Sequence, residues 1–228
     1  MYRFHIGRRF SKLAHIYWKE GHEEQAGELY SRAIELDPEN PETHLNLALL
    51  RLNAGRTVEA RKLMEGAIKV DPDYALTYYH LGKIYMREGD MEKALEIWGK
   101  HISLDPTAID ARFEMAVALD RAGRLDEALR HLHYIYEESP GDIRVLNNIG
   151  VIYSKRGEFD RAARIFEKAL KIEPNRPGVL VNAARAYCRL GDYSRAWGCV
   201  IRVERLGASV PGGLLTELNG AMLRPGTE

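Results

Sequence analysis

Hydrophobic residues recur along the chain at the spacing of amphipathic helices. In one such stretch, Tyr78, Leu81 and Tyr85 fall on one helical face, and Gly89 follows as a residue that readily closes a helix. Asp90 is then a suitable N-cap for a second helix. The apolar face of this second helix comprises Ala94, Leu95, Trp98 and Ile102. The pattern predicts two helices joined by a tight turn.

The same pattern returns every 34 residues, with glycine, alanine and proline at fixed positions. The glycines are Gly21, Gly55, Gly89, Gly123, Gly157 and Gly191; the alanines are Ala26, Ala60, Ala94, Ala128, Ala162 and Ala196; the prolines are Pro38, Pro72, Pro106, Pro140 and Pro174. Each proline ends a second helix, because it lacks the amide hydrogen and disfavours helical conformation before it. Six units are therefore expected, at 7–40, 41–74, 75–108, 109–142, 143–176 and 177–210.

These positions resemble the tetratricopeptide repeat. The fifth unit carries nearly the full pattern, with Leu146, Ile149, Gly150, Tyr153, Gly157, Ala162, Phe166, Ala169 and Pro174. The resemblance implies an all-α fold, a right-handed α-solenoid of six helix-turn-helix units. Residues 1–6 are expected to form an amino-terminal extension and residues 211–228 a cap and tail. Within the cap, Leu214, Leu215 and Leu218 predict a short helix that covers the last unit.

Composition and charge narrow the function. Hydrophobic residues make up 45% of the 228 residues, and 33 basic side chains balance 33 acidic ones. This balance disfavours a protein whose overall charge attracts nucleic acid or an anionic membrane surface. No apolar run approaches the roughly 20 residues that span a bilayer. Charges interrupt any secretory segment near the amino terminus, so a cytoplasmic location is expected.

The sequence displays no catalytic constellation. It lacks a phosphate-binding glycine loop, a nucleophile elbow and a zinc-protease motif. Cys188 and Cys199 are expected to be reduced thiols, and His131 and His133 would point to different faces of a helix. We therefore expect a protein that is not an enzyme and that has no cofactor or metal site.

The resemblance implies that positions 2, 5, 6, 9, 12 and 13 of each unit line a concave groove. Apolar residues at positions 5 and 9 form a stripe of Leu45, Leu49, Tyr79, Phe113, Val117 and Val151. An exposed apolar stripe is typical of a binding site, with Tyr79 and Phe113 as its central anchor. The alternative is that these side chains pack sideways against the neighbouring first helix.

Polar residues extend the expected groove. Position 6 holds Asn46, His80, Asn148 and Asn182, and asparagine can both donate to and accept from a peptide backbone. Lys83 and Arg121 would favour acidic partners. A cation near the carboxyl end of a helix, such as Arg121, is also stabilised by the helix dipole without any ligand.

The leading hypothesis is a protein-interaction scaffold or adaptor that holds a partner peptide or helix in the groove. Net charge leaves two alternatives open. Units one to four sum to −2, 0, −1 and −4, whereas units five and six sum to +4 and +3. Head-to-tail attraction between copies would give a self-assembling scaffold. The basic last two units could instead bind nucleic acid, although they lack a stacking platform of aromatic and basic residues.

Overall fold

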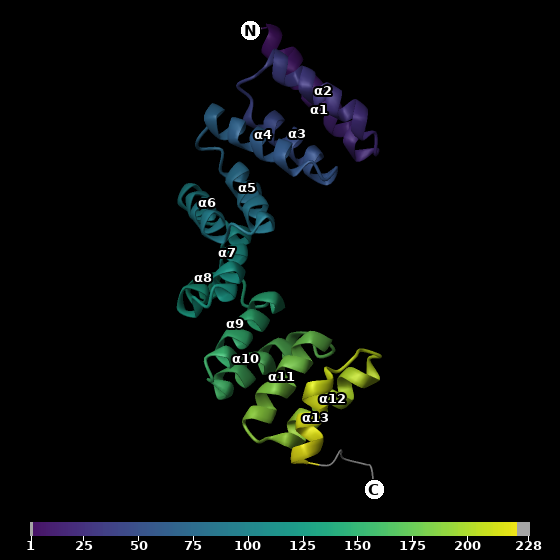
Figure 1. Ribbon diagram of the computed structural model, residues 1–228, viewed down its shortest axis with the longest axis vertical. Coiled ribbons are helices and arrows are strands. Elements are labelled where there is room, and N and C mark those ends of the chain that lie inside the picture. The colour runs from purple at the N-terminus through teal and green to yellow at the C-terminus, as the bar shows by residue number, and fades with distance from the viewer. Residues whose placement is uncertain (1, 223–228) are drawn as a thin grey trace. The chain divides into compact units, whose positions relative to one another are not determined.

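The computed structural model describes residues 2–222 (Figure 1). Thirteen α-helices and no strand lie within these residues, which confirms the all-α solenoid fold. The helices are α1 (Tyr2–Lys19), α2 (Glu23–Leu36), α3 (Pro41–Asn53), α4 (Thr57–Val70), α5 (Ala75–Glu88), α6 (Met91–Leu104), α7 (Ile109–Arg121), α8 (Leu125–Glu138), α9 (Ile143–Lys155), α10 (Phe159–Ile172), α11 (Pro177–Arg189), α12 (Tyr193–Arg205) and α13 (Gly212–Ala221). Residues 223–228 of the expected tail lie outside the described residues.

The helices begin and end where the sequence indicates. Asn40 caps α3 by accepting a hydrogen bond from the amide of Thr43 at 3.2 Å, with Pro41 as the first helical residue. Asp90 caps α6 in the same way through the amide of Lys93. Gly89 closes α5 with a φ of 84°, a left-handed conformation that costs glycine little.

The chain divides into two compact units, residues 1–111 and residues 112–228. In the first unit, α1 packs on α2, α2 on α3, α3 on α4, α4 on α5 and α5 on α6. A buried cluster of Ala14, Ala26, Tyr30, Leu47 and Leu50 joins α1, α2 and α3. Figure 1 shows α1 and α2 side by side at the amino-terminal end of the ribbon. Each helix thus contacts its neighbours in sequence.

The second unit follows the same order, with α8 on α9, α9 on α10, α10 on α11 and α11 on α12. Phe166 of α10 is fully buried and lies against Gly150 of α9, where a side chain would collide with the ring. The short helix α13 packs on α11 and α12 through the buried Leu214 and Leu218. The indole nitrogen of Trp197 donates to the carbonyl of Met222 at 3.2 Å, so the predicted capping helix is confirmed.

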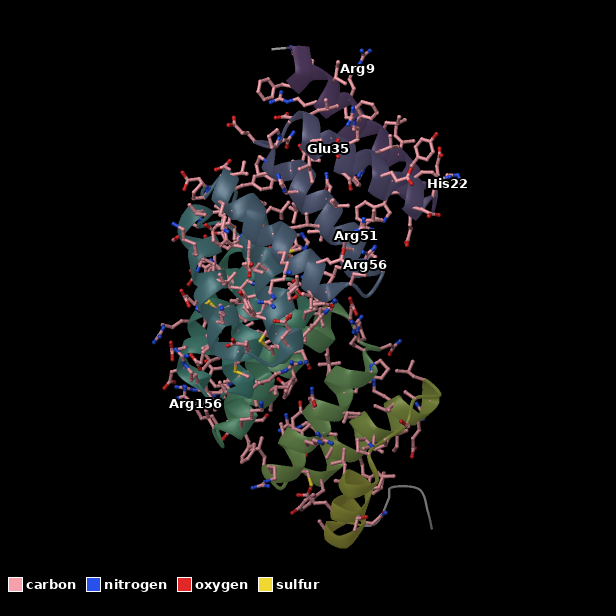
Figure 2. All side chains as sticks on the ribbon, turned by 45° about the horizontal axis from the view of Figure 1, so that its top comes forward. Arg9, His22, Glu35, Arg51, Arg56 and Arg156 are labelled. Atoms are coloured by element: carbon pink, nitrogen blue, oxygen red, sulfur yellow. The ribbon has the colours of Figure 1, made fainter. Side chains whose placement is uncertain are left out.

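Two details bear on the surfaces. The first helix begins at Tyr2, so residues 2–6 are helical and belong to α1. Figure 2 shows Arg51 and Arg56 close together near the end of α3, and both approach the carboxylate of Glu59, at 3.8 Å and 2.7 Å. None of the helices in residues 2–222 has both the length and the apolar character needed to cross a bilayer.

Candidate protein-interaction surfaces

A groove of about 1000 Å³ lies in the first unit, on the side formed by α1 and α3. We call it the α1–α3 groove. Its lining comes from α1, from the loop between α2 and α3, from α3 itself and from Tyr74. The residues are Phe4, Arg8, Ser11, Lys12, His15 and Ile16 of α1, Asp37, Glu39 and Asn40 of the loop, and Pro41, Glu42 and Asn46 of α3. Side chains of both charge signs and three apolar side chains therefore meet in one concavity.

Hydrogen bonds fix the polar floor of the α1–α3 groove. The hydroxyl of Thr43 donates to that of Ser11 at 3.1 Å, which ties α3 to α1. Asp37 is almost fully buried, and its carboxylate lies 3.9 Å from Nε of the exposed Arg8. The hydroxyl of Tyr30 meets Nδ1 of His15 at 3.5 Å. These contacts connect three side chains of α1 to α2, to α3 and to the loop between them.

Large apolar side chains are exposed beside this polar floor. Phe4 is 45% exposed and Ile16 is 51% exposed, although both are large and hydrophobic. Exposed apolar groups beside satisfied polar groups are typical of surfaces that bind another protein, because the apolar groups gain from being covered and the polar groups fix the register.

A second cavity of about 520 Å³ lies near the amino ends of α5 and α7, within residues 74–111. Tyr74 lines it as well as the α1–α3 groove. Tyr79 stands in its wall, with the ammonium group of Lys83 5.2 Å from the ring centroid and the ring of His80 5.1 Å away. The exposed Leu76 belongs to the same wall.

The ring of Tyr79 contacts two histidines, His80 and His101. His101 is buried, its ring lies 6.0 Å from that of Tyr79, and its Nδ1 lies 2.6 Å from the carbonyl of Ala75. Burial, together with the nearby charges of Lys83 and His101, lowers the pKa of His80 to about 4. His80 is therefore neutral near pH 7, and Lys83 supplies the local charge.

The structure corrects one of the predicted groove residues in the first unit. Leu45 is only 1% exposed, because it lies one helical turn before the fully buried Ala48 on the packed side of α3. The side chain of Leu45 is therefore not exposed to a ligand. Leu49 is half-buried, and Asn46 is the predicted residue that lines the α1–α3 groove.

The predicted residues of the second unit are partly engaged by the protein itself. Asn148 donates from Nδ2 to the carbonyl of Arg144 in its own helix at 2.7 Å, and Asn182 donates to Oδ1 of Asn147 at 2.9 Å. The guanidinium of Arg144 lies 5.1 Å from the ring centroid of Phe113. The remaining members are the half-buried Val117 and Val151 and the exposed Arg121.

Sequence reasoning missed most of the α1–α3 groove. Positions 2, 5, 6 and 9 of the first 34-residue repeat are occupied by Arg8, Ser11, Lys12 and His15. The groove was predicted from the same positions in the later repeats. The signal was present, but polar residues at these positions do not form the apolar stripe on which the prediction concentrated.

Cys188 and Cys199 are both buried thiols. Burial raises the pKa of both Cys188 and Cys199 to about 11, so both thiols stay protonated near pH 7. Cys199 lies beside a cavity of about 530 Å³ between α10 and α12, where Glu167 already accepts hydrogen bonds from Tyr187 and Arg195. Within residues 2–222, no three His, Cys, Asp or Glu side chains gather as a metal site would require.

The helix pairs, the 34-residue spacing and the small-to-aromatic contacts define a tetratricopeptide repeat protein, a class of protein-interaction scaffold. Residues 8–201 match the family described as the cilia and flagella-associated protein 70 C-terminal domain, and the chain belongs to this family. No protein of curated function matches the sequence.

Solved structures show the same fold. MamA is 25% identical over 75% of this chain and 93% of its own, with a TM-score of 0.67. YrrB, described as a TPR protein with an unusual peptide-binding site, is 24% identical over 75% of this chain and 88% of its own, with a TM-score of 0.66. PilF of Pseudomonas aeruginosa is 16% identical but covers 97% of this chain and all of its own, with a TM-score of 0.77.

Proposed function

We propose that the protein is a non-enzymatic adaptor that holds an extended segment of a partner protein in the α1–α3 groove. The observation that carries this proposal is the groove itself, about 1000 Å³ with a fixed polar floor and exposed apolar walls. YrrB, described as having an unusual peptide-binding site, supports peptide binding as a use of a similar fold.

The groove offers an extended peptide two kinds of contact. Asn46 presents both a donor and an acceptor, so it can pair with a peptide backbone whatever the sequence. Phe4 and Ile16 are placed to cover an apolar side chain of the ligand. Lys12 of α1 and Glu42 of α3 line the groove with opposite charges, which would orient a ligand with charges of both signs.

A displayed library of random ten-residue peptides, selected on the full chain, tests this proposal. Selected peptides should bind wild-type protein and lose about tenfold or more in affinity for a Lys12→Glu, Asn46→Ala double variant. Asn53→Ala is the matched control, because Asn53 is an exposed amide at the far end of α3. Peptides that bind the double variant as tightly as the wild type would contradict a groove site.

Tyr79 and Phe113 remain proposed anchors, one in each unit. Tyr79 borders the second cavity, and Phe113 is half-buried under Arg144. Tyr79→Ala should weaken peptides that bind at the second cavity by more than about 1 kcal/mol, and Phe113→Ala should weaken peptides that bind at Phe113 by as much. The melting temperature is the control: a variant that unfolds early while its folded fraction still binds would mean that the side chain belongs to the core.

A further inference from the structure

The outward side of α1 carries an apolar stripe that the groove does not use. Ile6, Phe10, Leu13 and Tyr17 follow one another at helical spacing, and we call them the α1 outer face. Leu13 is 41% exposed, and the other three are half-buried. None of the four lines the α1–α3 groove.

Four of the five later first helices bury the position equivalent to Leu13, and in the fifth, α7, Met115 is half-buried there. Residues 34, 68, 136 and 170 places after Leu13 are Leu47, Leu81, Ile149 and Ala183, which are 5%, 2%, 1% and 0% exposed. They belong to α3, α5, α9 and α11, and each of these helices packs against the helix that precedes it, namely α2, α4, α8 and α10. The fold therefore shows what covers such a face: an amphipathic helix laid across it.

Tyrosine hydroxyls mark the same contact. Tyr187 of α11 donates to the carboxylate of Glu167 in α10 at 2.7 Å, and the hydroxyl of Tyr153 of α9 lies 3.4 Å from Nε2 of His133 in α8. Tyr17 stands at the corresponding position of α1, and its hydroxyl has no hydrogen bond among the described residues. A covering helix would give this hydroxyl a partner.

The carboxyl-terminal end of the chain is treated differently. There α13 covers α12, with Leu214 3% and Leu218 0% exposed, and Trp197 bonds to the carbonyl of Met222. Stacked repeats need such an end cover, because the last helix pair otherwise exposes the surface that pairs bury between them. Residues 2–222 provide this cover for α12, whereas they cover the α1 outer face only in part, with Tyr17 packed against the buried cluster of α1, α2 and α3 and Leu13 exposed.

We propose that the α1 outer face binds an amphipathic helix of a partner protein, which lies where the second helix of a preceding pair would lie. The helix presents apolar side chains to Phe10 and Leu13 and a carboxylate to the hydroxyl of Tyr17, as Glu167 does for Tyr187. This site is separate from the α1–α3 groove and stands whether or not the groove binds peptide.

Charge favours an acidic helix over a second copy of this chain. Arg9 projects away from α1 (Figure 2) and is exposed. Two copies that met through this face would bring their Arg9 side chains together, whereas a carboxylate on a partner helix would meet Arg9 favourably.

The probe is a synthetic peptide of residues 157–174, the chain's own α10, stapled between its exposed positions 164 and 168 to hold it helical. Fluorescence anisotropy should show saturable binding of one peptide to the full chain. Leu13→Glu should weaken binding about tenfold or more, while Leu76→Glu, an equally exposed leucine at the second cavity, should change it less than about twofold. Both variants should keep the wild-type melting temperature.

A double-mutant cycle distinguishes this specific contact from nonspecific hydrophobic binding, which would not depend on the Tyr17 hydroxyl. The E167Q peptide should bind the wild-type chain more weakly, and this difference should disappear with the Tyr17→Phe chain. Absence of saturable binding, insensitivity to Leu13→Glu, or equal loss with Leu76→Glu would overturn the proposal. So would a dimer of the free chain that Leu13→Glu dissociates, because the face would then hold a second copy.

Discussion

Gly82 of α5 makes room for the indole of Trp98 in α6. A Cβ built at Gly82 would lie 2.7 Å from Cδ1 of Trp98, and the ring is 1% exposed with its nitrogen bonded to the carbonyl of Tyr79 at 3.1 Å. The ring cannot move aside without losing that bond. The close approach of the two helices therefore depends on the missing side chain.

We expect Gly82→Ala to lower the free energy of unfolding by about 1–3 kcal/mol, the usual cost of overpacking. Gly99→Ala in α6 is the matched control, because nothing lies within 4 Å of its Cβ position. That substitution should be neutral or should stabilise the helix by up to about 1 kcal/mol. Urea unfolding of both variants checks the pair, and equal effects would contradict the packing argument.

His80 links stability of the first unit to pH. Its pKa of about 4 in the folded state lies below the ordinary value of 6.5, so the unfolded chain binds the proton first. The stabilising effect of a neutral His80 is complete above pH 6.5 and is lost as the pH falls toward 4. We expect a loss of at most about 3 kcal/mol.

Unfolding in urea at pH 7.5 and pH 5 measures this dependence. His80→Gln should flatten it, because glutamine does not titrate in this range. The exposed His133 serves as the control, and His133→Gln should leave the slope as in the wild type. If His80→Gln keeps the full slope, another group is responsible.

Individual groove residues were harder to predict than the repeat. Glycine, alanine and proline spacing depends on close contacts and helix ends, which recur in every unit and so add up to a strong signal. Leu45 and Phe113 share a unit position, yet Leu45 is buried and Phe113 is half-buried under Arg144. Their exposure depends on the size and charge of neighbours from another helix, which the position alone does not specify.

At the scale of elements, α13 illustrates what an end cover contributes. Its residues Leu214 and Leu218 are nearly inaccessible, and it lies against α11 and α12. Hydrophobic spacing predicted this helix correctly. The open state of α1 was not predicted, because α1 carries the same pattern as every other first helix and differs only in having no helix laid over it among the described residues.

Truncation of Leu218 measures the contribution of α13. We expect Leu218→Ala to cost about 2–5 kcal/mol, since a fully buried leucine leaves a cavity. Asn219→Ala, at an exposed position of the same helix, should cost less than about 0.5 kcal/mol. Thermal unfolding followed by circular dichroism compares them. A Leu218→Ala variant as stable as Asn219→Ala would mean that α13 detaches readily.

At the scale of the whole molecule, neutrality hides an uneven distribution of charge. The fourth unit of the sequence carries −4, and the fifth and sixth carry +4 and +3. Part of this charge is already paired within residues 112–228, where Lys155 meets Asp120 at 2.7 Å and Arg156 meets Asp126 at 2.6 Å. Pairs of this kind on exposed surfaces contribute little to folding. The net positive charge that remains on the fifth and sixth repeats can attract acidic surfaces of other molecules.

We therefore expect weak attraction between copies that depends on salt. Light scattering at several protein concentrations should give a mean mass that rises with concentration at about 20 mM salt and returns to that of the monomer at about 500 mM, because the screening length falls several-fold between them. Association through an apolar face would instead persist or strengthen at high salt. A charge-reversed variant, Arg164→Glu with Lys171→Glu, removes two exposed cations of α10 and should abolish the low-salt association. A constant monomeric mass across the whole range would show that the charge asymmetry has no role in assembly.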